Sequence, residues 1–168
     1  MIRAARLDAT IYEQIKTDKT ALSQSMVVVV LSGVAGGLGN PSVSMPGPQN
    51  LAFAIICAFV SWLMWAWLIY LIGTKILPEP QTKTSVNELL RTIGFSSSPG
   101  ILWVLGVFQP LAGIIGNVVG VWILCAIIIA VRQTLDYKSI GRAVGVCVIV
   151  WLIFILTMFL LAVIGLRA

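Results

Sequence analysis

The chain has 168 residues, of which 59% are hydrophobic and only 10% charged, and its mean hydropathy is +1.02. Soluble domains carry about 25% charged residues, so a water-soluble fold of this size cannot bury so much apolar surface. We therefore interpret the chain as a single integral membrane domain. The net charge of +5 is more typical of Lys and Arg held at the cytoplasmic face of a membrane than of nucleic-acid binding, so no nucleic-acid partner is expected.

Residues 1–20 precede the first apolar run, and we expect them to form a cytoplasmic interfacial segment ahead of a membrane domain at 21–168. Leu7, Ile11 and Ile15 recur at four-residue steps, with the charged residues mostly elsewhere on the helical wheel. This stripe predicts an amphipathic helix that packs on lipid headgroups or on the protein's own spans. A capping-box pattern at residues 10–13 indicates that the helix breaks and restarts near Thr10.

The first two predicted spans are clear from length and flanking residues. Asp18 is placed to cap a span that ends near Leu38, and the uncharged, Pro- and Gly-rich stretch 39–50 forms a loop. The second span is predicted over 51–76, long enough to cross a hydrocarbon core of ~30 Å with some tilt. A capping box at residues 85–88 then predicts a short surface helix, and Ser98 followed by Pro99 starts the next span.

Residues 99–131 pose the main topological question. A single helix of this length would extend ~50 Å, which is too long, whereas two passes would be short. Charge favours two passes. With a hairpin here and a last span over 140–164, ten of the eleven Lys and Arg residues lie on one side of the membrane, and with a single pass only eight do. The sequence thus predicts an all-α polytopic helix bundle with five transmembrane spans, the third and fourth forming a tight hairpin, plus short interfacial helices.

The predicted hairpin holds the candidate site. Gly113, Gly116 and Asn117 suit a tight turn, with Gln109 and Pro110 near the outer end of the third span. Gln109 and Asn117 are interpreted either as a ligand-contacting pair or as hydrogen-bonding partners between helices, and the second reading is favoured. Small residues also repeat at four-residue spacing, which predicts close helix packing within the bundle or, alternatively, in a dimer. These rows are Ala112–Gly116–Gly120, Gly33–Gly37 and Gly141–Gly145.

The residues that catalysis requires are scarce. The chain has no histidine, and no Asp, Glu, Lys or Arg falls within a predicted span. Proton relays and ion-coupled transport depend on such groups, and nucleophilic or metal sites need histidine or clustered acids. We therefore expect no enzymatic activity, metal or cofactor. Trp103 is assigned to the inner interfacial belt, while Trp62 and Trp65 lie deeper, in contact with lipid, a neighbouring subunit, or a pigment or quinone.

Two stretches resemble a known family. These are YEQIKTDKTALSQSMVVVVLSGVAGGLG and the run from ILWVLGVFQPLAGIIGNVVGVW through LDYKSIGRAVGVCVIVWLI. They are similar to small prokaryotic members of the Yip family, in which a proline closes the third span, a glycine-containing turn follows and a Trp lies in the fourth. The matching positions here are Pro110, 113–117 and Trp122, and Arg132 to Ala143 match the basic loop and the start of the fifth span. The resemblance implies five spans and a cytosolic N-terminus.

The family resemblance does not extend to a function. Eukaryotic members are linked to Rab GTPases and vesicle traffic, but they carry a long N-terminal region and an acidic-Tyr-Gly-Pro motif that this sequence lacks. We predict a non-enzymatic scaffold or accessory subunit in a prokaryotic plasma membrane, with the lipid bilayer and other membrane subunits or a second copy as partners. The alternative is a conduit or binding protein for a neutral solute or lipid, lined by Gln109, Asn117, Ser61 and Thr157.

Overall fold

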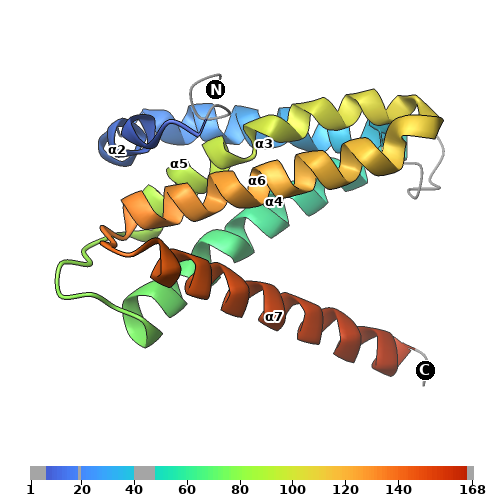
Figure 1. The fold of residues 1–168 in the computed structure, drawn as a ribbon. Helices are drawn as coiled ribbons and strands as arrows, with labels where there is room; N and C mark the ends of the chain where they lie inside the picture. The colour runs from blue at the N-terminus through green and yellow to red at the C-terminus, as the bar shows by residue number, and fades with distance from the viewer. Residues whose placement is uncertain (1–6, 19, 40–47, 166–168) are drawn as a thin grey trace.

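The computed structural model describes residues 7–18, 20–39 and 48–165, and its regular structure there is entirely helical (Figure 1). The elements are α2 (Ala9–Thr17), α3 (Ala21–Gly39), α4 (Pro48–Leu71), η1 (Ile72–Ile76), α5 (Val86–Ser96), η2 (Ser98–Val107), η3 (Gln109–Leu111), α6 (Ala112–Thr134) and α7 (Ile140–Gly165). Within the described residues, four stretches are long and apolar enough to cross a membrane: Ala21–Gly39, Leu51–Ile76, Gln109–Thr134 and Ile140–Thr157. The predicted all-α membrane bundle is confirmed.

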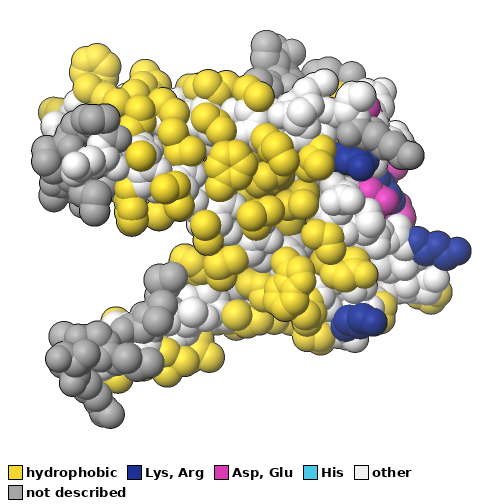
Figure 2. Space-filling view, turned by 180° about the vertical axis from the view of Figure 1, so that it is seen from behind, with side chains coloured by type: hydrophobic (Ala, Val, Ile, Leu, Met, Phe, Trp, Pro, Cys, Tyr) yellow, Lys and Arg dark blue, Asp and Glu magenta, His cyan; other side chains and the backbone are white. Residues whose placement is uncertain are grey.

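The long elements alternate in direction between two ends of the molecule (Figure 1). The start of α5, the end of α6 and the start of α7 meet at one end beside α2, and Figure 2 shows Lys and Arg gathered there. We call this the basic end (residues 7–18, 72–91 and 132–142). At the other end the chain reverses between η2 and α6, and we call it the turn end (residues 36–39, 48–55 and 104–116).

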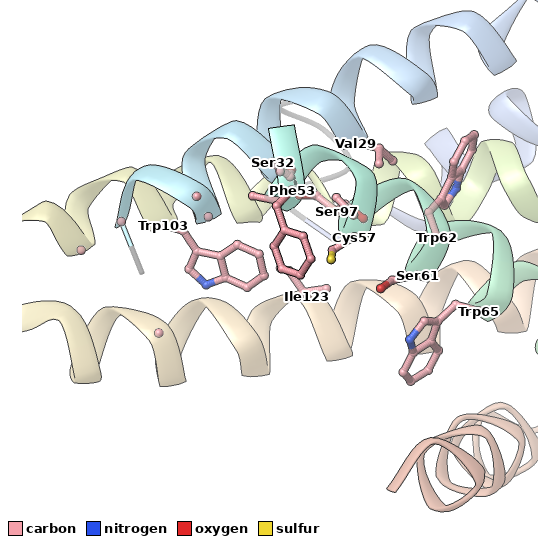
Figure 3. Close-up of a pocket in the computed structure, with 18 of the residues that line it drawn as sticks. Val29, Ser32, Phe53, Cys57, Ser61, Trp62, Trp65, Ser97, Trp103 and Ile123 are labelled. Carbon is pink, nitrogen blue, oxygen red and sulfur yellow. Dashed lines mark hydrogen bonds between the residues drawn. The ribbon is translucent and has the colours of Figure 1, made fainter. Parts of the chain in front are cut away.

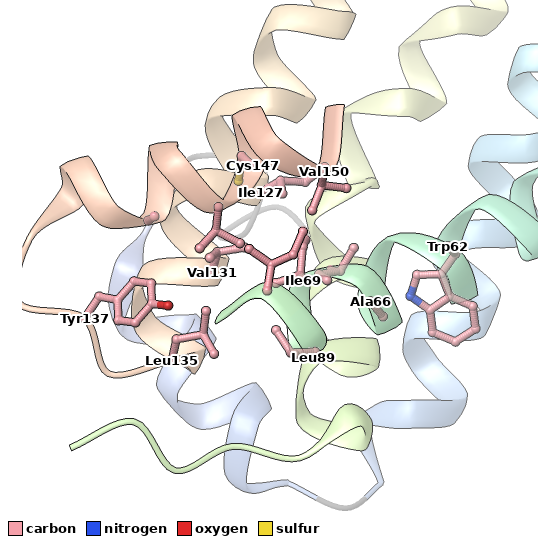
Figure 4. Packing of buried hydrophobic residues seen from close by; sticks show 14 of the residues in the cluster. Trp62, Ala66, Ile69, Leu89, Ile127, Val131, Leu135, Tyr137, Cys147 and Val150 are labelled. Carbon is pink, nitrogen blue, oxygen red and sulfur yellow. The ribbon is translucent and has the colours of Figure 1, made fainter. Parts of the chain in front are cut away.

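The main hydrophobic core lies toward the basic end, where α4, α5, α6 and α7 meet (Figure 4). Each helix contributes a fully buried side chain, such as Ile69, Leu89, Val131 and Val146. On α7 the buried positions end at Val150, and the described side chains beyond it are exposed or half-buried. The bundle is therefore tightly packed at one end and open toward the other.

The short helix α2 packs on the bundle. Its Tyr12 and Ile15 are buried in a second cluster with Phe95 of α5 and Ala130 of α6. Burial raises the pKa of Tyr12, against a smaller opposing effect of its hydrogen bond with Ser96. The amphipathic stripe was predicted to pack either on lipid headgroups or on the protein's own spans. Its described part packs against the protein's own helices.

The predicted start of α2, near Thr10, lies slightly too late in the chain. The helix begins at Ala9, and Asp8 is its N-cap because the Asp8 carboxylate accepts the backbone N–H of Thr10 at 3.0 Å. Aspartate is among the best N-cap residues, which explains why it prevails over the capping-box pattern that follows.

Ser85 is confirmed as the N-cap of α5, but the predicted surface position of the helix is wrong. Ser85 Oγ accepts the Glu88 N–H at 3.3 Å and donates to the Glu88 carboxylate at 3.1 Å. Beyond this first turn the helix enters the bundle, and Leu89, Ile93 and Phe95 are buried. Its polar residues lie mainly near its start, and α2, α3, α4 and α6 together cover the remainder.

The predicted position of the turn between the third and fourth passes is also wrong. The chain reverses at 108–111, while Gly113, Gly116 and Asn117 lie within the regular helix α6. Pro110 explains the difference, because proline has no N–H to donate and its fixed φ suits the first turn of a helix. The helix therefore starts beside the proline, and the glycines are tolerated inside it, as is common in membrane helices.

Side-chain bonds join the segments at the basic end. The Tyr137 hydroxyl lies 2.9 Å from the Gly73 carbonyl and 2.7 Å from the Leu77 carbonyl, at the end of the π-helix η1 where backbone acceptors lack helical partners. Burial, with a smaller contribution from Glu79, raises the pKa of Tyr137 to about 12, so this phenol remains a neutral donor at physiological pH. The base of α7 is thus fixed to the end of α4.

Two ion pairs add to this attachment. Lys16 Nζ lies 2.7 Å from Asp136 Oδ2 and joins α2 to the loop between α6 and α7. Arg142 Nε lies 3.3 Å from Glu79 Oε1 and joins α7 to the segment after η1. Partly exposed pairs of this kind contribute at most about 1 kcal/mol each, so they mainly fix orientation.

Candidate functional site

A pocket of about 690 Å³ lies between α4 and α6 (Figure 3). α3 and η2 form its back wall, and α4 and α6 form its sides. All lining residues fall within 29–65 or 93–127, and neither stretch contains a charged residue. A pocket of this size falls within the range of small-molecule sites in proteins, and its uncharged walls favour an apolar occupant.

One face of α4 forms the first side wall. Phe53, Cys57, Ser61 and Trp65 recur at four-residue spacing, so their side chains lie one above the other along the helix. Figure 3 shows them in a row facing the pocket. The wall changes along this row from an aromatic ring through a small thiol and hydroxyl to an indole.

The opposite wall is the face of α6 that begins at Ala112 and ends at Ile127, with Gly116 and Ile123 between them. Among the described residues the backbones of α4 and α6 stay apart, with the pocket between them, and their side chains belong to the same cluster only in the main core toward the basic end. Along the pocket the two helices are connected through α3, η2 and α5 behind it.

Glycines bring α3 and η2 together to form the back wall. A Cβ added to Gly39 would lie 1.7 Å from the Trp103 carbonyl oxygen, and one added to Gly106 would lie 2.3 Å from the Gly39 carbonyl oxygen. No side chain fits at either position, so the two backbones touch. Gly36 leaves room for the Trp103 ring, since a Cβ there would be 3.1 Å from the ring.

Close approach also occurs between α3 and its other neighbours. A Cβ added to Gly33 would lie 2.9 Å from the Ala58 Cβ on α4, and one added to Gly94 of α5 would lie 2.6 Å from the Ser25 Cβ. Gly33 therefore fulfils the packing role predicted for the Gly33–Gly37 row. Through these contacts α3 packs closely against η2, α4 and α5 at the back of the bundle.

The end of the pocket toward the basic end is closed. Trp62, Ile93 and Ile127 line it there, and each is less than one-tenth exposed. The Trp62 indole N–H donates to the Leu90 carbonyl at 2.9 Å, and its ring meets Phe59 edge to face with 5.9 Å between centroids. The hydrogen bond and the ring contact hold this floor in position.

The pocket opens to the side, away from α3 and η2. α7 contacts the bundle near its own base and then diverges from α4 and α6 (Figure 1). Its exposed side chains beyond Val150 include Trp151, Leu152, Leu156 and Phe159. Because these apolar residues belong to membrane-spanning helices, the opening faces hydrocarbon rather than water.

Few polar atoms face the pocket. The Ser32 hydroxyl donates to the Ser97 carbonyl at 2.6 Å, so this donor is already used within the wall. Ser61 and Ser97 add two further hydroxyls, and that of Ser97 donates to the Ile93 carbonyl at 3.4 Å. An occupant would therefore be held mainly by shape and dispersion contacts rather than by hydrogen bonds.

Of the six candidate positions singled out in the sequence, only Gly116 lines the pocket. Gln109 and Pro110 are exposed in η3, and the Asn117 amide donates to the Gly113 carbonyl of its own helix at 2.9 Å. The structure therefore does not bring Gln109 and Asn117 together at the pocket.

The small-residue row on α6 makes no close internal contact. A Cβ added to Gly113, Gly116 or Gly120 would meet no atom within 4 Å. Thr157, one of the polar residues considered for a conduit, donates to the Ile153 carbonyl of its own helix at 2.8 Å. Of the four residues named for that conduit only Ser61 faces the pocket, so a path lined by all four is not formed.

Most residues that line the pocket were not predicted from the sequence. Trp103, expected near the basic end, lies beside Gly36 and Gly39 toward the turn end, because α5 enters the bundle and η2 continues from it toward the turn end. The row Phe53–Cys57–Ser61–Trp65 was a usable signal, since it places a thiol and a hydroxyl between two aromatic rings on one face of a helix. The cluster of glycines at 33–39 was a second signal for close backbone approach.

Long apolar helices around a side-opening pocket define a polytopic membrane protein. Residues 9–161 match the Yip1 domain, and the chain belongs to this family. The family consists of membrane proteins and is not known for enzymatic activity. No curated protein and no solved structure matches the chain.

Proposed function

We propose that this Yip1-family chain is a non-enzymatic, five-pass membrane protein that binds a membrane lipid in the pocket between α4 and α6. The observation that carries the proposal is a pocket of about 690 Å³ with uncharged walls and a side opening at membrane depth. Water has few partners on such walls, and a bilayer supplies apolar molecules directly at the opening.

The five-pass topology rests on treating α5 and η2 together as the third pass. η2 has ten residues and extends only ~20 Å at the 3-10 rise, but the uncharged end of α5, from Thr92 to Ser96, adds ~7 Å on its basic-end side. The combined length comes close to a hydrocarbon core of ~30 Å. The basic end then faces the cytoplasm, the C-terminus lies outside, and residues 1–20 form the cytoplasmic segment of a plasma-membrane protein of prokaryotic type.

A single cysteine at the chain reversal tests this topology. Gln109 is exposed in η3, so Gln109→Cys in a background without Cys57, Cys125 and Cys147 should react with a membrane-impermeant maleimide from outside the cell only. Lys83→Cys, exposed at the basic end, is the matched control and should react only after the membrane is opened. Labelling of both positions from the same side would contradict the five-pass arrangement.

Filling the pocket should abolish lipid binding. Gly116 lines the pocket and has free space beside it, so the side chain of Gly116→Leu would project into the site without displacing backbone. We expect wild-type protein, purified in mild detergent, to carry lipid in intact-complex mass spectrometry and Gly116→Leu to lose it.

The matched control for this experiment is Gly120→Leu. It lies one helical turn further along α6, has the same free space and is outside the pocket lining, so it should retain lipid. Equal lipid retention by both variants, or a wild-type protein without bound lipid, would refute the pocket as the binding site.

A scaffold or accessory-subunit role is the second candidate, and the open glycine row of α6 favours it. Small residues with free space beside them allow another helix to approach closely. The same mass spectra address it, because a foreign membrane protein bound in stoichiometric amounts would support this role. Gly120→Leu should then release that protein, whereas it should leave bound lipid unchanged.

A further inference from the structure

We infer that the occupant of the pocket is one extended hydrocarbon chain, selected by its length and not by the charge of its headgroup. This inference deepens the proposed lipid binding and rests on it. It concerns what the site recognises, and three features carry it: the length of the pocket, its closed floor and its lack of charge.

The pocket is long in the direction of the helices. Its lining extends along α6 from Ala112 to Ile127, which corresponds to ~22 Å at 1.5 Å per residue, and along α4 from Phe53 to Trp65, which corresponds to ~18 Å. A compact solute would leave much of that length empty. An acyl or isoprenoid chain lying parallel to the helices contacts both walls along the whole length, which maximises dispersion contacts.

The floor limits how far such a chain can reach. Trp62, Ile93 and Ile127 close the pocket toward the basic end and are themselves packed into the main core. Each added CH₂ gains contacts until the terminal methyl group meets this floor, and a longer chain must bend or remain partly outside. A chain can enter through the side opening, but once it lies along the helices, the distance from the turn end of the pocket to the floor sets a preferred chain length.

No charged residue lines the pocket, so the charge of a lipid headgroup has no ionic partner there. The sequence has no charged residue from Thr20 to Thr74 or from Thr92 to Val131, and every lining residue falls within these stretches. The Lys and Arg residues named at the basic end lie beyond the closed floor. A headgroup left at the turn end is therefore not discriminated by charge, whereas lipid sites that read headgroups use basic pockets.

The native cysteines provide the test. Cys57 is an exposed thiol in the pocket wall, and Cys125 is an exposed thiol on α6 outside the lining. Alkylation of both thiols by a small apolar reagent is followed in detergent while phosphocholines of increasing saturated chain length are added. Occupancy at ten times the dissociation constant should slow the reaction of Cys57 roughly tenfold and leave Cys125 unchanged.

The expected result is protection of Cys57 that rises with chain length and then stops rising, and that is the same for phosphocholine, phosphoglycerol and neutral alcohol heads on one chain. Protection that follows headgroup charge, or that a compact apolar molecule provides equally well, would overturn the inference while leaving lipid or apolar binding intact. Failure of every lipid and apolar molecule to protect Cys57 would overturn the proposed function itself. Gly120→Leu should behave as wild type, and Gly116→Leu should lose the chain-length dependence.

Discussion

Replacing Gly106 by alanine is expected to separate η2 from α3 and to cost about 3 kcal/mol of stability, at or above the upper end for overpacked sites. The reason is geometric, because the new Cβ would lie 2.3 Å from the Gly39 carbonyl oxygen and both partners are backbone. A flexible side chain could move away from such a contact, but here one of the two elements has to shift. The back wall of the pocket would shift with it.

The measurement is the alkylation rate of Cys147, which is 2% exposed and reacts only when the core opens. In a background with Cys57 and Cys125 replaced by alanine, a loss of 3 kcal/mol should raise that rate roughly a hundredfold. Gly113→Ala is the matched control, since its Cβ meets no atom within 4 Å and alanine is the better helix former. Equal rates for the two variants would mean that α3 and η2 are not packed through their backbones.

The second large effect is expected from Trp62→Ala, at about 3–5 kcal/mol, as for other aromatic residues removed from packed cores. Trp62 is 5% exposed, and its indole N–H donates a hydrogen bond to the Leu90 carbonyl. The substitution therefore removes both core contacts and a hydrogen bond. It also removes the floor of the pocket. The same Cys147 assay measures the cost.

Trp67 provides the control for that experiment. It lies on the same helix but is 54% exposed, so Trp67→Ala changes contacts with lipid and should alter the opening of the core by about 0.5 kcal/mol or less. A comparable loss from both substitutions would show that tryptophan content in α4, rather than the floor of the pocket, determines stability.

The fold class could be predicted because the signals that determine it are local. Length and hydropathy place the second span at 51–76, and the structure has Leu51–Ile76 there. Ser85 caps its helix as the sequence indicates. Both features depend on residues adjacent in the chain, and no knowledge of the tertiary arrangement is needed.

The candidate site could not be predicted in the same way. Whether a glycine forms a turn or a helix contact depends on what lies opposite, and Gly113 and Gly39 look alike in sequence although only Gly39 touches another backbone. Polar residues such as Asn117 drew attention because they are rare in apolar runs, yet this one bonds within its own helix. The pocket arises instead because the backbones of α4 and α6 stay apart beyond the main core, and that separation depends on the packing of several elements together.

The divergence of α7 has a consequence for the surrounding bilayer. Because the base of α7 is joined to η1 and the segment after it through Tyr137 and the Arg142–Glu79 pair, and α7 leaves the bundle beyond Val150, the molecule has a larger cross-section near the turn end than near the basic end. A body of that shape displaces more area in one monolayer than in the other. Lipids of that monolayer must fill the angle between α7 and its neighbours, so the number of lipids that the protein excludes differs between the two leaflets.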